Sequence, residues 1–282
     1  MVATGQLPIP QITARRFGAR CLPALTDDAL YERTGVRVAF TGRAGGVSEG
    51  PYSSLNLGNH VGDDPASVER NRALVLEALD AADVPLVVPS QVHGEVVVEL
   101  DDASPEALDA AREAARAGAD ALVATVPGIA ALLCFADCVP VIVVSPTGRF
   151  AVAHAGWRGV ENGVAAKAVR ALARADAAEL GEDAASGYNV YVGPHIHASC
   201  FETGADVRKR FEDRFGSSCI PDERHVDLLE ALTVGLEEAG IDRARVADAG
   251  VCTVCSCDEF FSYRAAGGIC GRHGAVAFRK AG

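Results

Sequence analysis

The segment of this chain that is best equipped for chemistry follows a hydrophobic run at residues 150–153. It reads His154-Ala155-Gly156-Trp157-Arg158-Gly159 and contains the one tryptophan of the chain. A strand that ends in this way brings an imidazole, a guanidinium and a closely approaching backbone to one point, as functional sites at strand ends do. A single histidine after a strand is also a common structural residue, so this segment alone leaves both roles open.

Two further segments add possible metal ligands. Gln91-Val92-His93-Gly94 is a second polar turn between apolar runs, and Cys138 lies between the apolar runs 129–133 and 141–144. His93, Cys138 and His154 could supply the three protein ligands of an open zinc site, in which water or substrate takes the fourth position. Structural zinc sites draw their ligands from closely spaced pairs, so separations of 45 residues (138 − 93) and 16 residues (154 − 138) favour a catalytic metal.

These segments belong to a longer series of short motifs. The series runs through residues 40–48, 54–58, 61–65, 71–72, 91–94, 120–122, 137–140 and 154–159, and continues through 193–194, 200–202, 226–228, 252–253, 260–264 and 271–272. In this order the motifs resemble those of the YfiH-type laccase-domain family, whose members are described as polyphenol oxidases and as purine nucleoside phosphorylases. The resemblance covers nearly the whole chain.

The resemblance implies a function and a set of site residues. It implies phosphorolysis of adenosine, inosine, guanosine or methylthioadenosine to the base and ribose 1-phosphate, together with deamination of adenosine. It places zinc on His93, Cys138 and His154 as the catalytic residues, with copper as the less favoured metal. The expected partners are a nucleoside and phosphate, and the expected state is a monomer. The substrate-binding residues are expected to be Arg43, Gly46, Ser48, Asn56, Asp137, Arg158 and Arg264.

The residues themselves leave several of these roles open. Arg43 lies in a glycine-rich turn, where backbone N–H groups and a guanidinium can hold an anion. The turn matches neither the dinucleotide fingerprint nor the Walker pattern, and an ordinary turn explains it from sequence alone. Arg158 and Arg264 either clamp a phosphate or pair with acidic neighbours. Asp137 is either a substrate contact, an acceptor that orients an imidazole ligand, or a residue that caps a turn.

Two other functions are compatible with the same pocket. A cysteine-dependent amidase or hydrolase, of the kind that edits peptidoglycan precursors, would use Cys138 as nucleophile and His154 as base, which leaves His93 without a role. A copper polyphenol oxidase is the third possibility. His195-Ile196-His197 superficially resembles the His-x-His pairs of multicopper enzymes, but seven histidines are too few to build several such pairs.

A second group of cysteines also suggests a metal. Cys252, Cys255 and Cys257 lie within six residues, and with Cys200 or Cys270 as a fourth ligand they could bind a soft ion. The family resemblance includes Cys252 but neither of the other two. Since structural zinc needs four ligands, a second metal is the less favoured interpretation.

Composition narrows the class of protein. The net charge of −12 argues against binding to nucleic acid or to anionic membranes. No apolar run reaches the roughly 18 residues of a membrane helix, and residues 1–10 lack the features of a secretory signal. Nine cysteines are an odd number, without the density of a disulfide scaffold, so a reducing cytoplasm is the expected compartment.

Periodicity predicts a mixed α+β fold. Helical patterns cover residues 66–82, 105–117, 160–178, 205–215 and 227–239. Strand patterns cover residues 36–40, 96–100, 129–133, 139–144, 150–153, 188–192, 246–249 and 275–278. Because several strands follow one another without a helix, a purely βαβ sheet is excluded. We expect a single-domain layered sandwich with mixed sheets and flanking helices over residues 11–282. Residues 1–10 are expected to be disordered, and residues 101–118 to form a solvated helix.

Overall fold

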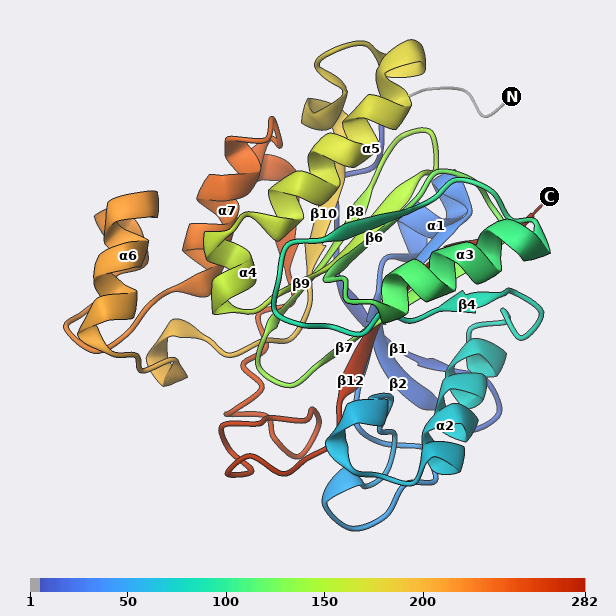
Figure 1. Ribbon diagram of the computed structural model, residues 1–282, viewed down its shortest axis with the longest axis horizontal. Coiled ribbons are helices and arrows are strands. Elements are labelled where there is room, and N and C mark those ends of the chain that lie inside the picture. Colours follow the sequence, from blue (N-terminus) through green and yellow to red (C-terminus); the bar gives the residue numbers. More distant parts are fainter. Residues whose placement is uncertain (1–5, 282) are drawn as a thin grey trace.

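The computed structural model describes residues 6–281. Two six-stranded sheets lie face to face, with helices on their outer sides (Figure 1). The first sheet has the order β1 (Thr13–Phe17), β2 (Leu22–Thr26), β3 (Val36–Thr41), β12 (His273–Arg279), β7 (Ile129–Phe135) and β4 (Leu86–Val87). The second sheet has the order β11 (Val246–Asp248), β10 (Asn189–Val192), β8 (Val139–Val144), β9 (Phe150–Ala155), β6 (Ala121–Ala124) and β5 (Val97–Leu100).

Both sheets are mixed. The pairs β4–β7, β5–β6 and β10–β11 are parallel, and the other neighbouring pairs are antiparallel. The central strands β7, β8 and β9 are buried along their whole length, as expected for strands that are covered on both faces and read as continuous apolar runs. The predicted mixed α+β sandwich with flanking helices is therefore confirmed.

Strand alternation divides the core into layers. Along β7, Ile129, Leu133 and Phe135 pack into the cluster between the two sheets, while Leu132 and Cys134 point to the other face and pack under α2 (Pro65–Ala78). This is the two-residue period of a strand whose two faces are both buried. On the far side of the second sheet a separate apolar cluster lies under the helices. The layers are thus helix, sheet, sheet and helix.

Helices of the second half of the chain cover the second sheet (Figure 1). They are α4 (Trp157–Glu161), α5 (Val164–Leu180), α6 (Ala205–Phe215) and α7 (Leu228–Glu237). The predicted helix over residues 160–178 is divided into α4 and α5, because Gly163 adopts a left-handed conformation with φ 72°. The other four predicted helices are confirmed within a few residues, and a short helix that was not predicted, α1 (Asp28–Thr34), packs beside β3.

Two predicted features of the chain need correction. The helix expected to be solvated, α3 (Pro105–Arg116), buries Leu108 and Ala115 against the sheet edge. Of the segment 1–10 that was expected to be disordered, residues 1–5 lie outside the described residues, but Leu7 and Pro10 are buried. The Pro8 carbonyl accepts a hydrogen bond from Asn189 Nδ2 at 2.8 Å.

The possible metal ligands lie at one edge of the sandwich. Strands β7 and β9 end there and β8 begins there, with Pro140 of β8 opposite His154 of β9. The loop between β4 and β5 carries His93 to the same edge, because β4 pairs with β7 and β5 with β6. The antiparallel β8–β9 pair and the parallel β4–β7 and β5–β6 pairs thus bring together residues that are far apart in the sequence.

Candidate metal centre

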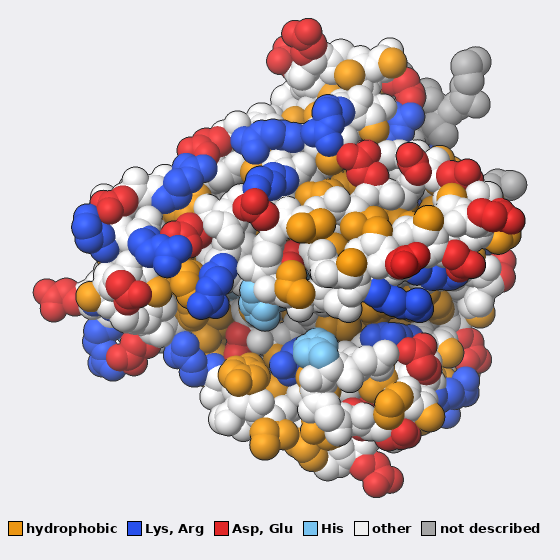
Figure 2. Space-filling view, viewed as in Figure 1, with side chains coloured by type: hydrophobic (Ala, Val, Ile, Leu, Met, Phe, Trp, Pro, Cys, Tyr) orange, Lys and Arg blue, Asp and Glu red, His pale blue; other side chains and the backbone are white. Residues whose placement is uncertain are grey.

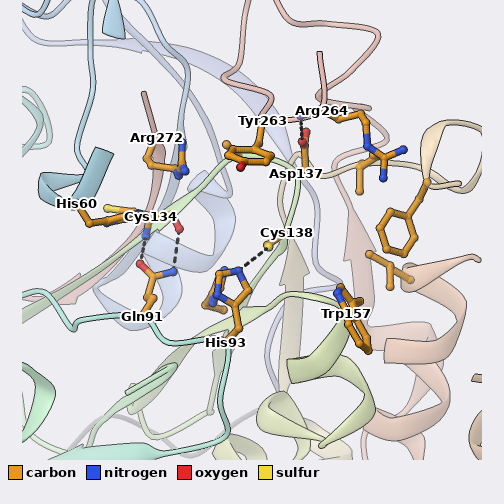
Figure 3. Close-up of a pocket in the computed structure, with 15 residues that line it drawn as sticks. His60, Gln91, His93, Cys134, Asp137, Cys138, Trp157, Tyr263, Arg264 and Arg272 are labelled. Carbon is orange, nitrogen blue, oxygen red and sulfur yellow. Dashed lines mark hydrogen bonds between the residues drawn. The ribbon is translucent and has the colours of Figure 1, made fainter. Parts of the chain in front are cut away.

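His93, Cys138 and His154 meet at this edge. One ligand atom from each lies within 4.8 Å of the other two. The Cys138 Sγ atom is 3.7 Å from His93 Nε2 (Figure 3), and the two imidazole rings are 4.8 Å apart at 77°. The structure therefore brings together the three residues that the sequence suggested as metal ligands.

The sheet holds two of the three ligands rigidly. His154 is the fifth residue of β9 and is buried, and Cys138 immediately precedes β8. Between β7 and β8 the chain turns through Asp137, whose φ of 86° is unusual for a residue with a side chain. Such strain persists where the surroundings fix it, and here the neighbouring buried strands fix the turn that presents Cys138.

A single carboxylate organises the third ligand. Asp120, fully buried, accepts hydrogen bonds from three successive backbone N–H groups of the loop, those of Val92, His93 and Gly94, at 2.7–3.2 Å. These N–H groups converge because His93 has a left-handed φ of 57°, which makes a nest of amides around an anion. The His93 loop is thus fixed without regular secondary structure.

The same carboxylate also orients His154. Asp120 Oδ1 lies 2.8 Å from His154 Nδ1, which leaves Nε2 for the cluster and fixes the tautomer, as partners of metal-bound imidazoles commonly do. Burial would raise the pKa of Asp120, but the hydrogen bonds from His154 and Gly94 outweigh burial and lower that pKa. Asp120 therefore remains an anion that supports two ligands.

A glycine makes room for the cluster. A Cβ atom on Gly156 would lie 2.9 Å from His93 Cδ2 and 3.0 Å from Cys138 Sγ. Both distances are at or below the closest approach that real Cβ atoms show. The glycine that follows the His154 strand is therefore required for the two ligands to approach the backbone.

Cys138 and His154 shift each other's pKa. Burial would raise the pKa of the Cys138 thiol, but the positive charge of His154 and hydrogen bonds from both histidines lower it to about 6. Burial would lower the pKa of His154, but the Cys138 thiolate and Asp120 raise it to about 9. The chain thus stabilises the thiolate, which is the form of cysteine that binds metals.

The cluster opens into a cavity of about 430 Å³. Figure 2 shows histidine side chains beside a hollow in the middle of this face of the molecule, with Lys and Arg side chains near it. The aromatic side chains that line the cavity are Trp157, Phe201 and Tyr263, and the basic ones outside the metal-ligand group are His60, Arg264 and Arg272. This combination of apolar walls with a few convergent polar groups is typical of a small-molecule site.

Only part of the predicted substrate-binding set lines this cavity. Arg264 and Asp137 do, whereas Arg43, Gly46, Ser48, Asn56 and Arg158 are not among its lining residues. Arg158 is exposed, and its guanidinium lies 4.2 Å from the centre of the Trp157 ring. The Arg43 guanidinium donates to the Ser53 and Cys257 carbonyls. The Arg43 guanidinium thus joins two parts of the chain, and neither arginine is among the residues that line the cavity.

The glycine-rich turn after β3 is occupied by its own chain. The Gly45 and Gly46 N–H groups donate to Ser54 Oγ, and the Val47 N–H donates to Asn71 Oδ1. Ser48 Oγ and Asn56 Nδ2 both donate to Asp63. An anion-binding nest requires free N–H groups, so we correct the prediction that this turn cradles an anion.

Asp137 lines the cavity, and its carboxylate binds neighbouring segments of the chain instead of an imidazole ligand. Its carboxylate accepts a hydrogen bond from Thr253 Oγ1 at 2.6 Å. It also accepts one from the Arg264 backbone N–H at 2.7 Å (Figure 3). The imidazole ligands donate no hydrogen bond to it among those found in residues 6–281. Asp137 therefore ties two C-terminal segments to the turn that presents Cys138, and Asp120 has the role of orienting an imidazole.

Several residues at the site have roles that their sequence positions do not predict. Asp120 is part of a matching motif, and Gln91 is the start of the His93 turn. The Gln91 side-chain amide donates to the Cys134 carbonyl and accepts from its N–H, at 2.8 and 2.7 Å (Figure 3). Arg272 is positioned by its backbone N–H, which donates to Asn56 Oδ1 at 2.8 Å. The position of Gln91, two residues before His93, is a signal that could have identified it, whereas nothing in the sequence near the ligands points to Asp120.

The donor set of the cluster fits zinc. Two imidazoles and one thiolate are ligands that zinc prefers, and three protein ligands leave the open position of a catalytic site. Among residues 6–281 one further group of three possible ligands exists, Cys200, Cys252 and Cys255. His195 and His197, with rings 5.0 Å apart, belong to neither group. No helix among these residues is long and apolar enough to cross a membrane.

Comparison with known proteins agrees with this geometry. A protein from Pseudomonas aeruginosa named purine nucleoside phosphorylase is 35% identical over 237 residues, which cover 81% of this chain and 88% of the relative. A protein named adenosine deaminase, from an unknown prokaryotic organism, is 34% identical over 255 residues, covering 87% and 95%.

The fold is also found among solved structures. The crystal structure of the Bacillus licheniformis hypothetical protein YfiH is similar with a TM-score of 0.79 and 27% identity, over 91% of this chain and 96% of that one. The family model described as multi-copper polyphenol oxidoreductase laccase matches residues 37–280. As its motifs predicted, the chain belongs to this laccase-like family.

Proposed function

We propose that this protein is a zinc-dependent purine nucleoside enzyme that cleaves nucleosides with phosphate and also deaminates adenosine. The observation that carries the proposal is the opening of a three-ligand metal cluster into a cavity of about 430 Å³ with aromatic and arginine side chains in its wall. The names of the relatives, purine nucleoside phosphorylase and adenosine deaminase, support the same substrate class. The proposed substrates are adenosine, inosine, guanosine and methylthioadenosine.

The cavity supplies the surfaces that a nucleoside requires. Its volume lies within the range of about 300–1,000 Å³ that is usual for small-ligand sites. The faces of Trp157, Phe201 and Tyr263 offer apolar area for a purine ring. In the proposed complex the base lies against these rings with C6 toward the metal cluster, and C1′ of the ribose faces the arginines.

Phosphate is the proposed second substrate for base cleavage. Arg264 and Arg272 line the cavity, and a guanidinium has five N–H donors in a geometry that suits phosphate oxygens. In phosphorolysis a phosphate oxygen forms a bond to C1′ of the ribose while the bond from C1′ to the base nitrogen breaks, and the base leaves with a proton. Fixed positive charge beside C1′ would hold the nucleophile and stabilise the transition state.

The metal cluster serves the proposed deamination. Zinc bound there would supply a Lewis acid that activates water at neutral pH. Asp120 keeps His154 in one tautomer and holds the backbone of His93, so both imidazoles remain in place while water attacks C6 of adenine and ammonia leaves. Nine free cysteines suit a reducing compartment, and we propose that the protein acts as a monomer in the cytoplasm.

Chromatography of reaction mixtures tests the proposal. The purified zinc-loaded protein is incubated with adenosine, inosine, guanosine or methylthioadenosine, with and without inorganic phosphate. We expect free base and the corresponding sugar 1-phosphate only with phosphate, and inosine from adenosine in both mixtures. Chelation should stop both reactions, and zinc should restore them. If no base is released from any of the four nucleosides, the proposal is wrong.

One observation favours a second candidate, a cysteine-dependent amidase. Cys138, His154 and Asp120 form a series in which Asp120 orients the imidazole beside a thiol of lowered pKa, which is the arrangement of a cysteine nucleophile with its base. His93 has no task in that mechanism. An active protein after His93→Ala, together with activity that survives chelation, would support the amidase.

A further inference from the structure

A second cluster of sulfur atoms lies outside the metal centre. Cys200, Cys252 and Cys255 each place a sulfur within 4.8 Å of the other two, and the Sγ atoms of Cys200 and Cys255 are 3.7 Å apart. Cys200 and Cys252 belong to segments that match the family, but Cys255 does not. Cys257 and Cys270, which the sequence also suggested, are not part of the group.

The separation of the Cys200 and Cys255 sulfurs fits one shared ion. Two sulfurs that are each about 2.3 Å from the same metal lie about 3.8 Å apart at a tetrahedral angle and about 4.0 Å apart at a trigonal angle. The Cys200–Cys255 separation of 3.7 Å is close to both values. A disulfide would need the two sulfurs to approach to about 2.05 Å. The metal-binding arrangement thus requires less movement than a disulfide does.

The chain holds two of the sulfurs in place and leaves the third accessible. Cys252 is buried, pairs with His195 through a β-bridge, and its Sγ accepts the His197 backbone N–H at 3.5 Å. Cys200 ends a 3₁₀ turn (Ala198–Cys200). Cys255 is exposed. A soft ion could therefore enter from the Cys255 side without unfolding of the chain.

We propose that Cys200, Cys252 and Cys255 form a binding site for a soft monovalent cation, Cu⁺. Thiolates select soft ions such as Cu⁺ and zinc. A structural zinc requires four ligands, whereas three thiolates complete the trigonal coordination of Cu⁺. Residues 6–281 contribute three ligand atoms to this group and no fourth, which favours Cu⁺. Binding displaces the thiol protons and involves no change of oxidation state.

The proposed site lies directly behind the wall of the nucleoside cavity. Phe201, which follows Cys200, lines that cavity, and Arg264 Nη1 donates to the Cys200 carbonyl at 3.1 Å. Thr253, which follows Cys252, donates to Asp137. An ion that joins these segments would fix Phe201 and Arg264 from behind, but the proposed site does not depend on the function of the cavity.

Anaerobic titration with Cu⁺ tests the proposal. The full-length protein is stripped of metal, titrated with Cu⁺ against a chromogenic Cu⁺ chelator, and compared with Cys255→Ser and with Cys257→Ser. Cys257 is the matched control, because it is exposed, lies two residues away and is outside the group. We expect Cys255→Ser to bind one equivalent less than the unchanged protein, and Cys257→Ser to bind the same number.

X-ray absorption separates this site from the histidine-containing one. In His93→Ala, where the other cluster has lost a ligand, the bound copper should have a shell of three sulfurs and no nitrogen. Equal copper binding by the unchanged protein and Cys255→Ser would overturn the proposal, as would equal losses in Cys255→Ser and Cys257→Ser. A three-sulfur shell that takes zinc but not Cu⁺ would contradict the choice of ion.

Discussion

The two groups of possible metal ligands are built in different ways. The histidine-containing group uses two residues at the ends of buried strands and one in a loop, and a buried carboxylate supports two of its three ligands. The thiol group lies in a 3₁₀ turn and a loop, and its supports are a β-bridge at Cys252, the backbone N–H that reaches the Cys252 sulfur, and the Arg264 guanidinium on the Cys200 carbonyl. Rigid strand ends with a supporting shell provide the precision that catalysis requires, whereas soft thiolates tolerate a looser frame. The difference indicates a reacting centre in the first group and a binding or bracing site in the second.

Loss of a ligand should distinguish the two groups most strongly. We expect His93→Ala to reduce both nucleoside reactions to the uncatalysed background, because it removes one of three ligands of an open metal site. Cys255→Ser should leave at least half of the activity. Steady-state rates and metal content by mass spectrometry measure this contrast. If the His93→Ala protein has full activity without bound metal, the zinc mechanism is wrong.

The supporting carboxylate should have the next largest effect. Asp120→Asn weakens the charge-assisted hydrogen bonds to His154 and to the His93 loop, so we expect metal affinity or turnover to fall roughly 10–100-fold. Asp137→Asn is the matched control, since Asp137 is also a largely buried aspartate at the site but holds Thr253 and Arg264 instead. It should raise KM and leave zinc affinity unchanged. If the two variants lose zinc equally, the roles given to these aspartates are wrong.

Crowding of the metal centre should have a smaller effect. The methyl group of Gly156→Ala would press on His93 and Cys138, and overpacking costs about 1–3 kcal/mol, so we expect zinc affinity to fall roughly tenfold. Gly187→Ala is the control, because its nearest contact would be Pro146 at 3.8 Å. Competition titrations with a zinc chelator measure the zinc affinity of both variants. Equal affinities would show that the ligands can move aside.

The smallest effect is expected at the cavity wall. Arg272→Ala removes a partly exposed positive charge, and a screened charge pair is worth about 1 kcal/mol or less, so KM for phosphate should rise about fivefold at most. Arg158→Ala should leave that KM unchanged, because Arg158 stacks on Trp157 outside the cavity. Reaction rates measured over a range of phosphate concentrations give this KM for both variants. A larger rise for Arg158→Ala would restore the original prediction for that residue.

The sequence predicts the central strands well and the edges poorly. The continuous apolar runs of β7, β8 and β9 are six or seven residues long, and β8 is rich in β-branched residues, which favours buried strands over buried helix segments. Strand β1 reads Thr-Ala-Arg-Arg-Phe and is exposed at its centre, so its pairing with β2 leaves no apolar pattern. Strand β6 has four residues and follows Asp120, which is too short for periodicity to detect.

At the site, residue type identifies ligands better than it identifies their supports. Two histidines and a cysteine in polar turns beside apolar runs form a set of metal ligands when they are taken together, and so His93, Cys138 and His154 could be found. Asp120 lies 27 residues from His93 and 34 from His154 in the sequence, and an isolated aspartate is common in any chain. The Arg43 turn has the residue types of an anion-binding turn. The sequence does not show that its N–H groups already donate to Ser54 and Asn71.

The single carboxylate of Asp120 also determines how the metal centre can open. The amide protons of residues 92–94 and the Nδ1–H of His154 share this one acceptor, so the loop cannot lift without exposing a buried anion that has lost its partners. Movement of the His93 loop and release of its imidazole from a metal are then a single cooperative event. The exchange of those three amide protons with solvent would therefore follow the lifetime of the bound ion.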